Sequence, residues 1–367
     1  MSRFTPDAFV STPVDIKTFI TDPQYLGDFL CGGLYPYWQD KLQETYEEDM
    51  TSPISEVVIS GSLGIGKNCA AVVGFLYDLY VLTLVKDPHS YLKIIPGMPL
   101  DMVISVPGGN SSNICDLVKD AIWLSPYFVS ILLTKNRDVL EEGMFPNQIG
   151  ILPIENRADV LGRGVIGCIF EDSVYDTVND KRRMQDIYYM CRRRMISRFM
   201  TQDGSVPCKL WTVTSASNFP ESFLWDVLEE YRAADSVKVI EPSIWQAQAH
   251  KGIYCGETFS VFIGDGYDAP RILKDGEIGD DNLHGRVIHV PVEYLDEFQN
   301  DIYSALPDWA GVPVIKPKPP EITPAWHTHI VSYLSNDSKF NRAVLYAFGV
   351  IIVFILGVIY GVYGIKL

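Results

Sequence analysis

The chain has 367 residues, of which 47% are hydrophobic, so it can bury a large core in one big domain or two small ones. Its formal net charge of −16 excludes a generally basic nucleic-acid coat, and any DNA contact must come from local basic patches. The seven cysteines are scattered and form no Cys-x-x-Cys pair, which indicates reduced, buried thiols rather than a disulfide framework.

The first predicted strand–turn–helix unit carries the strongest motif. Residues 57–60 (VVIS) are a short β-branched run, residues 61–68 read GSLGIGKN, and residues 69–84 are apolar enough for a helix. The turn fits the phosphate-binding template Gly-x-x-x-x-Gly-Lys-Ser/Thr at both template glycines and at the lysine. A position between a buried strand and a helix is the context that this template requires, so the sequence predicts an ATP site here.

Each part of this loop has a predicted role. The glycines let backbone N–H groups wrap around phosphates, and the helix N-terminus adds a positive dipole. Lys67 is expected to reach the β- and γ-phosphates. Asn68 departs from the template, because a Ser or Thr hydroxyl normally ligates magnesium there, and magnesium tolerates little distortion. The predicted nucleotide-binding residues of the loop are Gly61, Gly64, Gly66, Lys67 and Asn68.

Two further buried strands are predicted at residues 102–106 and 165–170, and two acids, Glu171 and Asp172, follow the second. This is the Walker B arrangement, in which one acid holds Mg²⁺ and the next orients or deprotonates the attacking water. The usual order is Asp then Glu. With the order reversed, Glu171 is predicted to serve the metal and Asp172 the water. A misplacement of about 1 Å can cost on the order of 100-fold in rate, so slow or absent hydrolysis stays open. Two solvated acids after a core strand are the alternative.

A predicted helix at residues 181–200 concentrates basic residues in this acidic chain. Helical spacing turns Ile187, Cys191 and Met195 toward the core and leaves several arginines on the exposed side. The candidate contacts with DNA phosphates are Arg182, Arg183, Arg193 and Arg194. A solvated surface with neighbouring aspartates as ion-pair partners is at least as good an interpretation.

Four more strands are expected, at residues 210–214, 237–240, 259–263 and 287–290. Strands and helices thus alternate along the chain. This alternation predicts an α/β P-loop NTPase fold, with a mainly parallel sheet flanked by helices on both faces.

The C-terminal part has a different character. Prolines crowd the start of residues 313–342, which predicts a stiff linker followed by a short helix. Residues 343–365 contain no charged side chain and are long enough to cross a bilayer, which needs about 20 apolar residues. The sequence therefore predicts an ATPase domain at residues 1–312, a linker and one transmembrane helix, with the ATPase domain in the host cytoplasm. A buried core helix is the alternative.

The order of these motifs resembles the ATPase domain of tailed-phage terminase large subunits. Residues 34–39 (LYPYWQ) resemble that family's adenine-binding Q motif, which places Gln39 against the base. Residues 156–164 (NRADVLGRG) resemble its Arg-Gly segment before Walker B, which makes Arg163 a candidate γ-phosphate-sensing or finger arginine. Thr214 resembles the start of its coupling motif.

The likeness extends over residues 14–312 and includes Ser215 with Thr214 in the coupling motif. It implies ATP and Mg²⁺ as cofactors, double-stranded DNA as the substrate, a homo-oligomeric ring, and a portal or small terminase subunit as docking partner. The family continues into a nuclease that needs a cluster of carboxylates. Beyond the prolines this chain has only Glu321 and Asp337, so no nuclease activity is expected.

Three functions remain open from the sequence. The first is a packaging ATPase tethered to a membrane, favoured by Gln39, Lys67 and Arg163. The second is a membrane-anchored scaffold or assembly factor that binds nucleotide but hydrolyses it weakly, favoured by Asn68 and the reversed acids. The third is a terminase split across genes, and the predicted membrane span counts against it. We expect the motor, with the scaffold as the main alternative.

Overall fold

The computed structural model describes residues 4–49, 53–105, 113–133, 144–171, 178–201, 204–219, 222–265, 267–274, 277 and 286–314. All of these belong to one unit of the chain, residues 1–316. Within this described part, no helix is both long and apolar enough to span a membrane. The predicted span, residues 343–365, and nearly all of the predicted linker lie outside the described residues.

A seven-stranded sheet forms the centre of this unit. Every neighbouring pair of strands is parallel except β3–β4. In sheet order, the strands are β3 (Met144–Phe145), β4 (Ile149–Ile154), β2 (Leu100–Ser105), β5 (Val165–Glu171), β6 (Leu210–Val213), β1 (Glu56–Ile59) and β7 (Val237–Ile240). The fold is therefore mixed α/β with a mainly parallel sheet, as the sequence predicts, and it is consistent with a P-loop-like fold.

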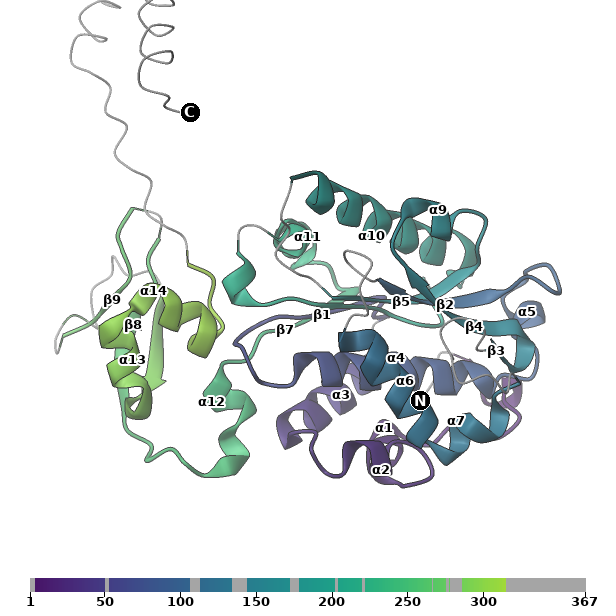
Figure 1. Cartoon of the computed structure of the whole chain (residues 1–367), viewed down its shortest axis with the longest axis horizontal. Coiled ribbons are helices and arrows are strands. Elements are labelled where there is room, and N and C mark those ends of the chain that lie inside the picture. Colours follow the sequence, from purple (N-terminus) through teal and green to yellow (C-terminus); the bar gives the residue numbers. More distant parts are fainter. Residues whose placement is uncertain are drawn as a thin grey trace, which may run out of the picture. The chain divides into compact units, whose positions relative to one another are not determined.

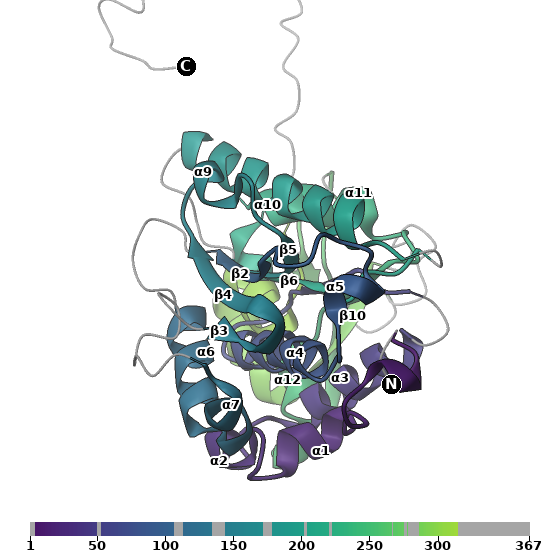
Figure 2. The same cartoon turned by 90° about the vertical axis from the view of Figure 1, so that its right-hand side faces the viewer.

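Helices cover both faces of this sheet, which is why its central strands are buried along their length (Figures 1 and 2). One face carries α9 (Arg157–Val160), α10 (Val178–Phe199) and α11 (Phe223–Tyr231). The other carries α1 (Ile16–Thr21), α2 (Gly27–Leu30), α3 (Pro36–Glu48), α4 (Lys67–Thr83), α6 (Asn113–Leu124) and α7 (Pro126–Ile131). Short α5 (Pro88–Tyr91) lies near the β4 edge. Helix α4 is buried nearly all round, because it lies between the sheet and an outer layer of helices.

A smaller antiparallel sheet follows in the chain. Its strands are β10 (Val287–Pro291), β8 (Thr258–Phe262) and β9 (Arg271–Ile272), in that order. It packs with α13 (Leu295–Asn300), α14 (Ile302–Ala305) and the turn η8 (Leu306–Ala310), and α12 (Ile244–Ala247) precedes it. The expectation that residues 259–263 and 287–290 join the parallel sheet is wrong. Val261 on β8 pairs antiparallel with Ile288 on β10 and with Ile272 on β9, so these strands form a separate sheet.

The cysteines are all free, as expected. Their predicted burial holds for four of them, whereas Cys31 and Cys255 are exposed and Cys69 is half-buried.

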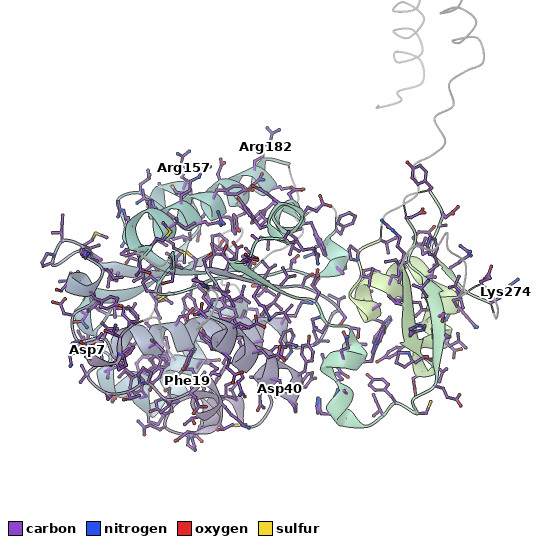
Figure 3. The ribbon with its side chains drawn as sticks, turned by 180° about the vertical axis from the view of Figure 1, so that it is seen from behind. Asp7, Phe19, Asp40, Arg157, Arg182 and Lys274 are labelled. Carbon is purple, nitrogen blue, oxygen red and sulfur yellow. The ribbon has the colours of Figure 1, made fainter. Side chains whose placement is uncertain are left out.

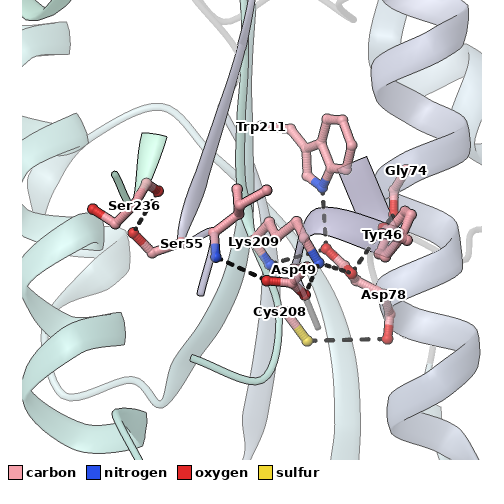
Figure 4. Close-up of polar contacts among 10 residues, drawn as sticks. Tyr46, Asp49, Ser55, Gly74, Asp78, Cys208, Lys209, Trp211 and Ser236 are labelled. Carbon is pink, nitrogen blue, oxygen red and sulfur yellow. Dashed lines mark hydrogen bonds and ion pairs between the residues drawn. The ribbon is translucent and has the colours of Figure 1, made fainter. Parts of the chain in front are cut away.

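A buried ionic cluster ties α4 to the start of β6 (Figure 4). Lys209 is 2% exposed, and its ammonium lies 3.1 Å from Asp49 and 3.5 Å from Asp78. Asp78 on α4 also accepts hydrogen bonds from the Trp211 indole at 3.1 Å and from the Tyr46 hydroxyl at 2.9 Å. Because every charge here has a partner, this cluster fixes α4 against the sheet.

Removing one charge from this cluster is expected to be costly. Lys209→Met leaves the carboxylates of Asp49 and Asp78 buried and uncompensated, which should lower the free energy of unfolding by about 3–5 kcal/mol. Urea unfolding followed by tryptophan fluorescence measures this loss. The control is Arg232→Met, at an ion pair with Glu241 whose arginine is 51% exposed, and it should cost less than about 1 kcal/mol. Equal losses in the two variants would contradict this account.

Candidate nucleotide-binding site

A pocket of about 370 Å³ opens at the carboxyl ends of β1, β5 and β6. This volume is in the range of roughly 300–1,000 Å³ typical of ligand pockets. The pocket is where parallel α/β sheets commonly bind ligands, because loops and helix N-termini converge there. Its lining residues are Leu63, Gly64, Ile65, Gly66, Lys67, Asn68, Asn113, Glu171, Val213, Thr214 and Ser215. Predicted site residues from three separate segments therefore share one pocket, and Asn113 joins them without having been predicted.

The glycine loop wraps around the start of α4. Gly61, Gly64 and Gly66 have φ values of 100°, 66° and 83°, a region that other residues rarely adopt. Gly66 caps α4, and Lys67 is the first residue of the helix. Within the described residues, the backbone N–H groups of Gly64, Ile65 and Gly66 have no hydrogen-bond partner. Free N–H groups at a helix N-terminus are suited to an anion such as a phosphate.

Lys67 is buried without a carboxylate partner among the described residues. Its side chain is folded back on the loop, where the ammonium donates to the Ser62 carbonyl and lies 3.4 Å from the Gly61 carbonyl. The residue is only 8% exposed, and burial lowers the pKa of Lys67 to about 8. An anion in the pocket would stabilise the protonated form, because it would supply the missing counter-charge.

Asn68 and Glu171, the two predicted metal ligands, lie side by side. The Asn68 amide Nδ2 donates to the Glu171 carboxylate at 2.6 Å. Burial raises the pKa of Glu171, and hydrogen bonds from Asn68 and from the backbone of Ile114 act in the opposite direction. In this arrangement the Asn68 amide oxygen and the carboxylate are the atoms left for a cation.

Magnesium has few protein ligands to use here. No group of three or more histidine, cysteine, aspartate or glutamate residues in the described part of the chain could hold a metal ion. Asp172, predicted to serve the attacking water, lies outside the described residues. Mg²⁺ in nucleotide sites commonly uses one or two carboxylates together with substrate phosphates and waters. Glu171 and the oxygen of Asn68 fit that pattern.

Strand β6 connects the glycine loop with the Walker B strand, because it lies between β1 and β5 in the sheet. At its end, the backbone N–H of Thr214 donates to the Ile59 carbonyl at 2.9 Å, and the N–H of Ala216 donates to Gly61 at 3.2 Å. The Trp225 indole donates to the Ser215 carbonyl at 3.3 Å. Thr214 and Ser215 therefore line the pocket next to Ala216, whose N–H contacts the loop directly.

Gln39 is not among the pocket's lining residues. Its amide instead donates to the Leu34 carbonyl, at 2.9 Å. The preceding residue, Trp38, contacts the loop: its indole donates to the Ile65 carbonyl at 2.5 Å, and it is 1% exposed. The segment resembling the Q motif thus supports the glycine loop through Trp38, a residue that the sequence pattern did not single out. The sequence feature that could have indicated this role is a tryptophan in the first turn of an otherwise mostly polar helix, α3.

Arg163 lies at the end of the sheet opposite the pocket. It precedes β5, and Glu171 ends that strand, so about 20 Å of strand separates them. The Arg163 side chain is held locally, by the Asp159 carbonyl at 3.2 Å and by Asp101 at 3.9 Å. The structure therefore does not bring Arg163 to the pocket, and its predicted role at the γ-phosphate has no support from this geometry.

The outer wall of the loop comes from the C-terminal end of the described chain. The Leu63 N–H donates to the Asp308 carbonyl at 3.0 Å. Gly311, with φ of 70°, lies so close that an added Cβ would be 2.6 Å from the Ser62 nitrogen. The chain thus passes directly against the glycine loop just before the predicted linker begins.

Gly311→Ala is expected to weaken nucleotide binding, because its Cβ would push Ser62 and the loop aside. Overpacking of this kind typically costs about 1–3 kcal/mol. Gly252→Ala is the matched control, since Gly252 has a similar φ of 62° with nothing within 4 Å of an added Cβ. Both variants carry the same backbone strain, but only the first should lower ATP affinity in a titration. Equal affinities would show that this contact leaves the loop unaffected.

The predicted orientation of α10 is confirmed, since Ile187, Cys191 and Met195 are buried. Arg182, Arg183 and Arg193 are exposed and Arg194 is half-buried. Figure 3 shows Arg157 and Arg182 projecting on the same outer side of the molecule. Arg183 forms the ion pair with Asp180 that the alternative interpretation expects, at 3.5 Å. Arg182 and Arg193 are separated by about 16 Å of helix, so the four arginines do not form one cluster.

Comparison with known proteins adds a weak likeness. No family model matches the chain, and no curated protein matches it. Among solved structures, the chain is similar to the large terminase of bacteriophage HK97, with a TM-score of 0.40 and 10% sequence identity. The match covers 66% of this chain and 44% of the terminase chain, so it spans less than half of that protein. At this score the likeness carries no argument about the fold or the function of this chain.

Proposed function

We propose that this chain binds ATP with Mg²⁺ in the pocket at the ends of β1, β5 and β6, and hydrolyses it. The observation that carries the proposal is the meeting of Lys67, Asn68 and Glu171 in that pocket from two distant segments. A buried lysine without a carboxylate partner, unpaired loop N–H groups and a carboxylate at one end suit a triphosphate with its metal.

Each residue has a defined part in this proposal. The loop N–H groups and Lys67 hold the β- and γ-phosphates, and Lys67 counters the charge that develops during phosphoryl transfer. The Asn68 oxygen and Glu171 hold Mg²⁺, which supplies further charge neutralisation when bound. Asp172 orients the attacking water. Thr214 and Ser215, which precede the loop contact of Ala216, pass changes in the loop to the rest of the sheet.

We further propose that hydrolysis drives the packaging of double-stranded viral DNA, by a homo-oligomeric ring tethered to a membrane through residues 343–365. This role rests on the order of the sequence motifs from residue 14 to residue 312, which resembles that of terminase large subunits. It includes no nuclease step. A portal or a small terminase subunit is the docking partner that this role requires.

One observation favours a second function, a membrane-anchored scaffold that binds ATP but hydrolyses it weakly. Asn68 and Glu171 are hydrogen-bonded to each other at 2.6 Å, so each partly satisfies the other where a metal would bind. An amide also takes the place of the usual hydroxyl. The two functions share the binding step and differ in turnover.

The binding step is tested by titrating the full-length chain, in detergent, with ATP and with AMP, each with and without Mg²⁺. The proposal predicts binding of ATP that Mg²⁺ strengthens, and much weaker binding of AMP, because the pocket's contacts are to the β- and γ-phosphates. Equal affinity for ATP and AMP would contradict it.

A further inference from the structure

A second pocket, of about 360 Å³, lies beside α9 and the C-terminal half of α10. It shares no lining residue with the nucleotide pocket. Four arginines from the two helices converge on it, Arg157, Arg193, Arg194 and Arg198. The other lining residues are Asp186, Tyr189, Met190 and Ser197.

None of these four arginines forms an ion pair with a carboxylate among the described residues. Acids are not scarce, since the protein has 46 acidic and 30 basic residues. Elsewhere, for example, Lys181 pairs with Asp226 at 3.4 Å and Arg192 with Glu56 at 3.3 Å. Four arginines without an ion pair thus share this pocket with a single carboxylate, that of Asp186.

The geometry holds two of the guanidinium groups close together. Arg194 and Arg198 both donate to the same acceptor, the Arg163 carbonyl, at 3.1 and 2.8 Å. Arg194 has in addition a buried Nε–H with no partner in the described structure. Two like charges on one oxygen repel each other, and an anion between them would remove that repulsion.

The position of the cluster at a helix C-terminus explains only part of it. The helix dipole favours cations in the last turn by about 0.3–1 kcal/mol each, which accounts for Arg198. It does not account for Arg157, which comes from α9, a separate helix. A fork of guanidinium groups from two elements is the arrangement that recognises phosphate oxygens.

We propose that this pocket binds a backbone phosphate of duplex DNA, an inference that rests on the proposed DNA-packaging role. The exposed Arg182 and Arg183, the latter paired with Asp180 at 3.5 Å, lie about 16 Å further along α10. A second basic position at that spacing suits a linear polyanion better than a single small ion. The binding site for DNA phosphate is then the Arg157–Arg193–Arg194–Arg198 cluster, with Arg182 and Arg183 as flanking contacts. DNA binding at this pocket does not depend on ATP binding in the other one.

The test is fluorescence anisotropy of a labelled 30-base-pair duplex with the full-length chain in detergent, across a series of salt concentrations. The variants are Arg193→Gln/Arg194→Gln and, because Arg194 is half-buried, the surface variant Arg157→Gln alone. We expect the double variant to bind roughly tenfold or more weakly. The slope of log K against log salt should become shallower by about 0.9 for each arginine–phosphate interaction that the substitutions remove.

The control is Arg232→Gln/Arg271→Gln, which removes the same charge from two arginines that are ion-paired outside the pocket. It should leave both the affinity and most of the salt slope unchanged. Equal weakening by control and pocket variants would reduce the effect to net charge and overturn the proposal. Absence of DNA binding by the unmodified chain would also overturn the proposal. Pocket variants that bind DNA normally but lose ATP turnover would overturn it too, and would assign the cluster to the nucleotide of a neighbouring subunit. ATP titration of the same variants shows whether the nucleotide site is intact, and it therefore separates failure of the DNA-binding proposal from failure of the proposed ATPase.

Discussion

Lys67→Ala is expected to weaken ATP binding by on the order of 10- to 100-fold. The ammonium is the only charged donor among the residues lining the pocket, and a charge-assisted hydrogen bond to a phosphate typically contributes about 1.5–3 kcal/mol. The alanine variant should fold normally, because the buried ammonium it removes has no carboxylate partner among the described residues and is held only by loop carbonyls. Calorimetric titration with ATP and Mg²⁺ measures the loss.

The same side chain should make binding depend on pH. Burial lowers the pKa of Lys67 to about 8, and a bound triphosphate would raise it, because it favours the charged form. Below pH 8 the lysine is protonated with or without ATP, so the affinity is constant. Above pH 8 the free protein must take up a proton to bind, and affinity should fall by up to about tenfold per pH unit. A phosphate monoester, with its second pKa of about 6, stays fully ionised throughout this window.

Lys67→Arg is the matched control for this dependence. A guanidinium stays protonated to beyond pH 12, so any binding that the variant retains should be flat between about pH 7.5 and 10 by the same measurement. A wild-type affinity that is also flat would show that Lys67 does not contact the phosphates.

Glu171→Gln is expected to lower Mg²⁺-dependent turnover by roughly 100- to 1,000-fold, with much less effect on ATP binding. The amide keeps the shape of the carboxylate and can still accept the hydrogen bond from Asn68. It cannot supply the negative charge that holds the metal, which contributes several kcal/mol to the transition state. Steady-state phosphate release at saturating ATP measures the effect.

Stability separates this result from simple damage to the fold. Burial raises the pKa of Glu171, so its charged form is disfavoured in the folded protein. Neutralising it should leave the melting temperature unchanged or higher. A variant that melts earlier and loses ATP binding would identify Glu171 as a structural residue. Unchanged turnover in a well-folded variant would exclude Glu171 as a metal ligand. A wild-type chain that binds ATP without hydrolysing it would favour the scaffold function.

The central part of the fold could be predicted because its signals are local. A β-branched run followed by the glycine loop predicts β1 and α4, and an apolar run ending in acids predicts β5. Strand β4 was missed because it contains Gly150 and Pro153, which normally argue against a strand. Proline is tolerated there because β4 is covered on its outer side only by the two-residue β3.

The functional site was predicted in part, for a related reason. Residues within the glycine loop lie together by sequence, and Glu171 and Thr214 join them because parallel strands end at one edge of the sheet. Gln39 and Arg163 were assigned from motif resemblance, which does not fix where a side chain lies. Arg163 precedes β5 and Glu171 ends it, so the length of this strand already places Arg163 at the end of the sheet opposite the pocket. The pairing of Asn68 with Glu171 depends on tertiary contact and has no local signal.

The most direct test of the ATPase proposal is ATP turnover by the full-length chain with Mg²⁺, measured with and without duplex DNA, alongside Lys67→Ala. The account predicts turnover that DNA stimulates and that the alanine variant loses. DNA stimulation would support the motor, and turnover without stimulation would support an ATPase of another kind. Absence of turnover in a chain that binds ATP tightly would contradict the motor and leave the nucleotide-binding scaffold.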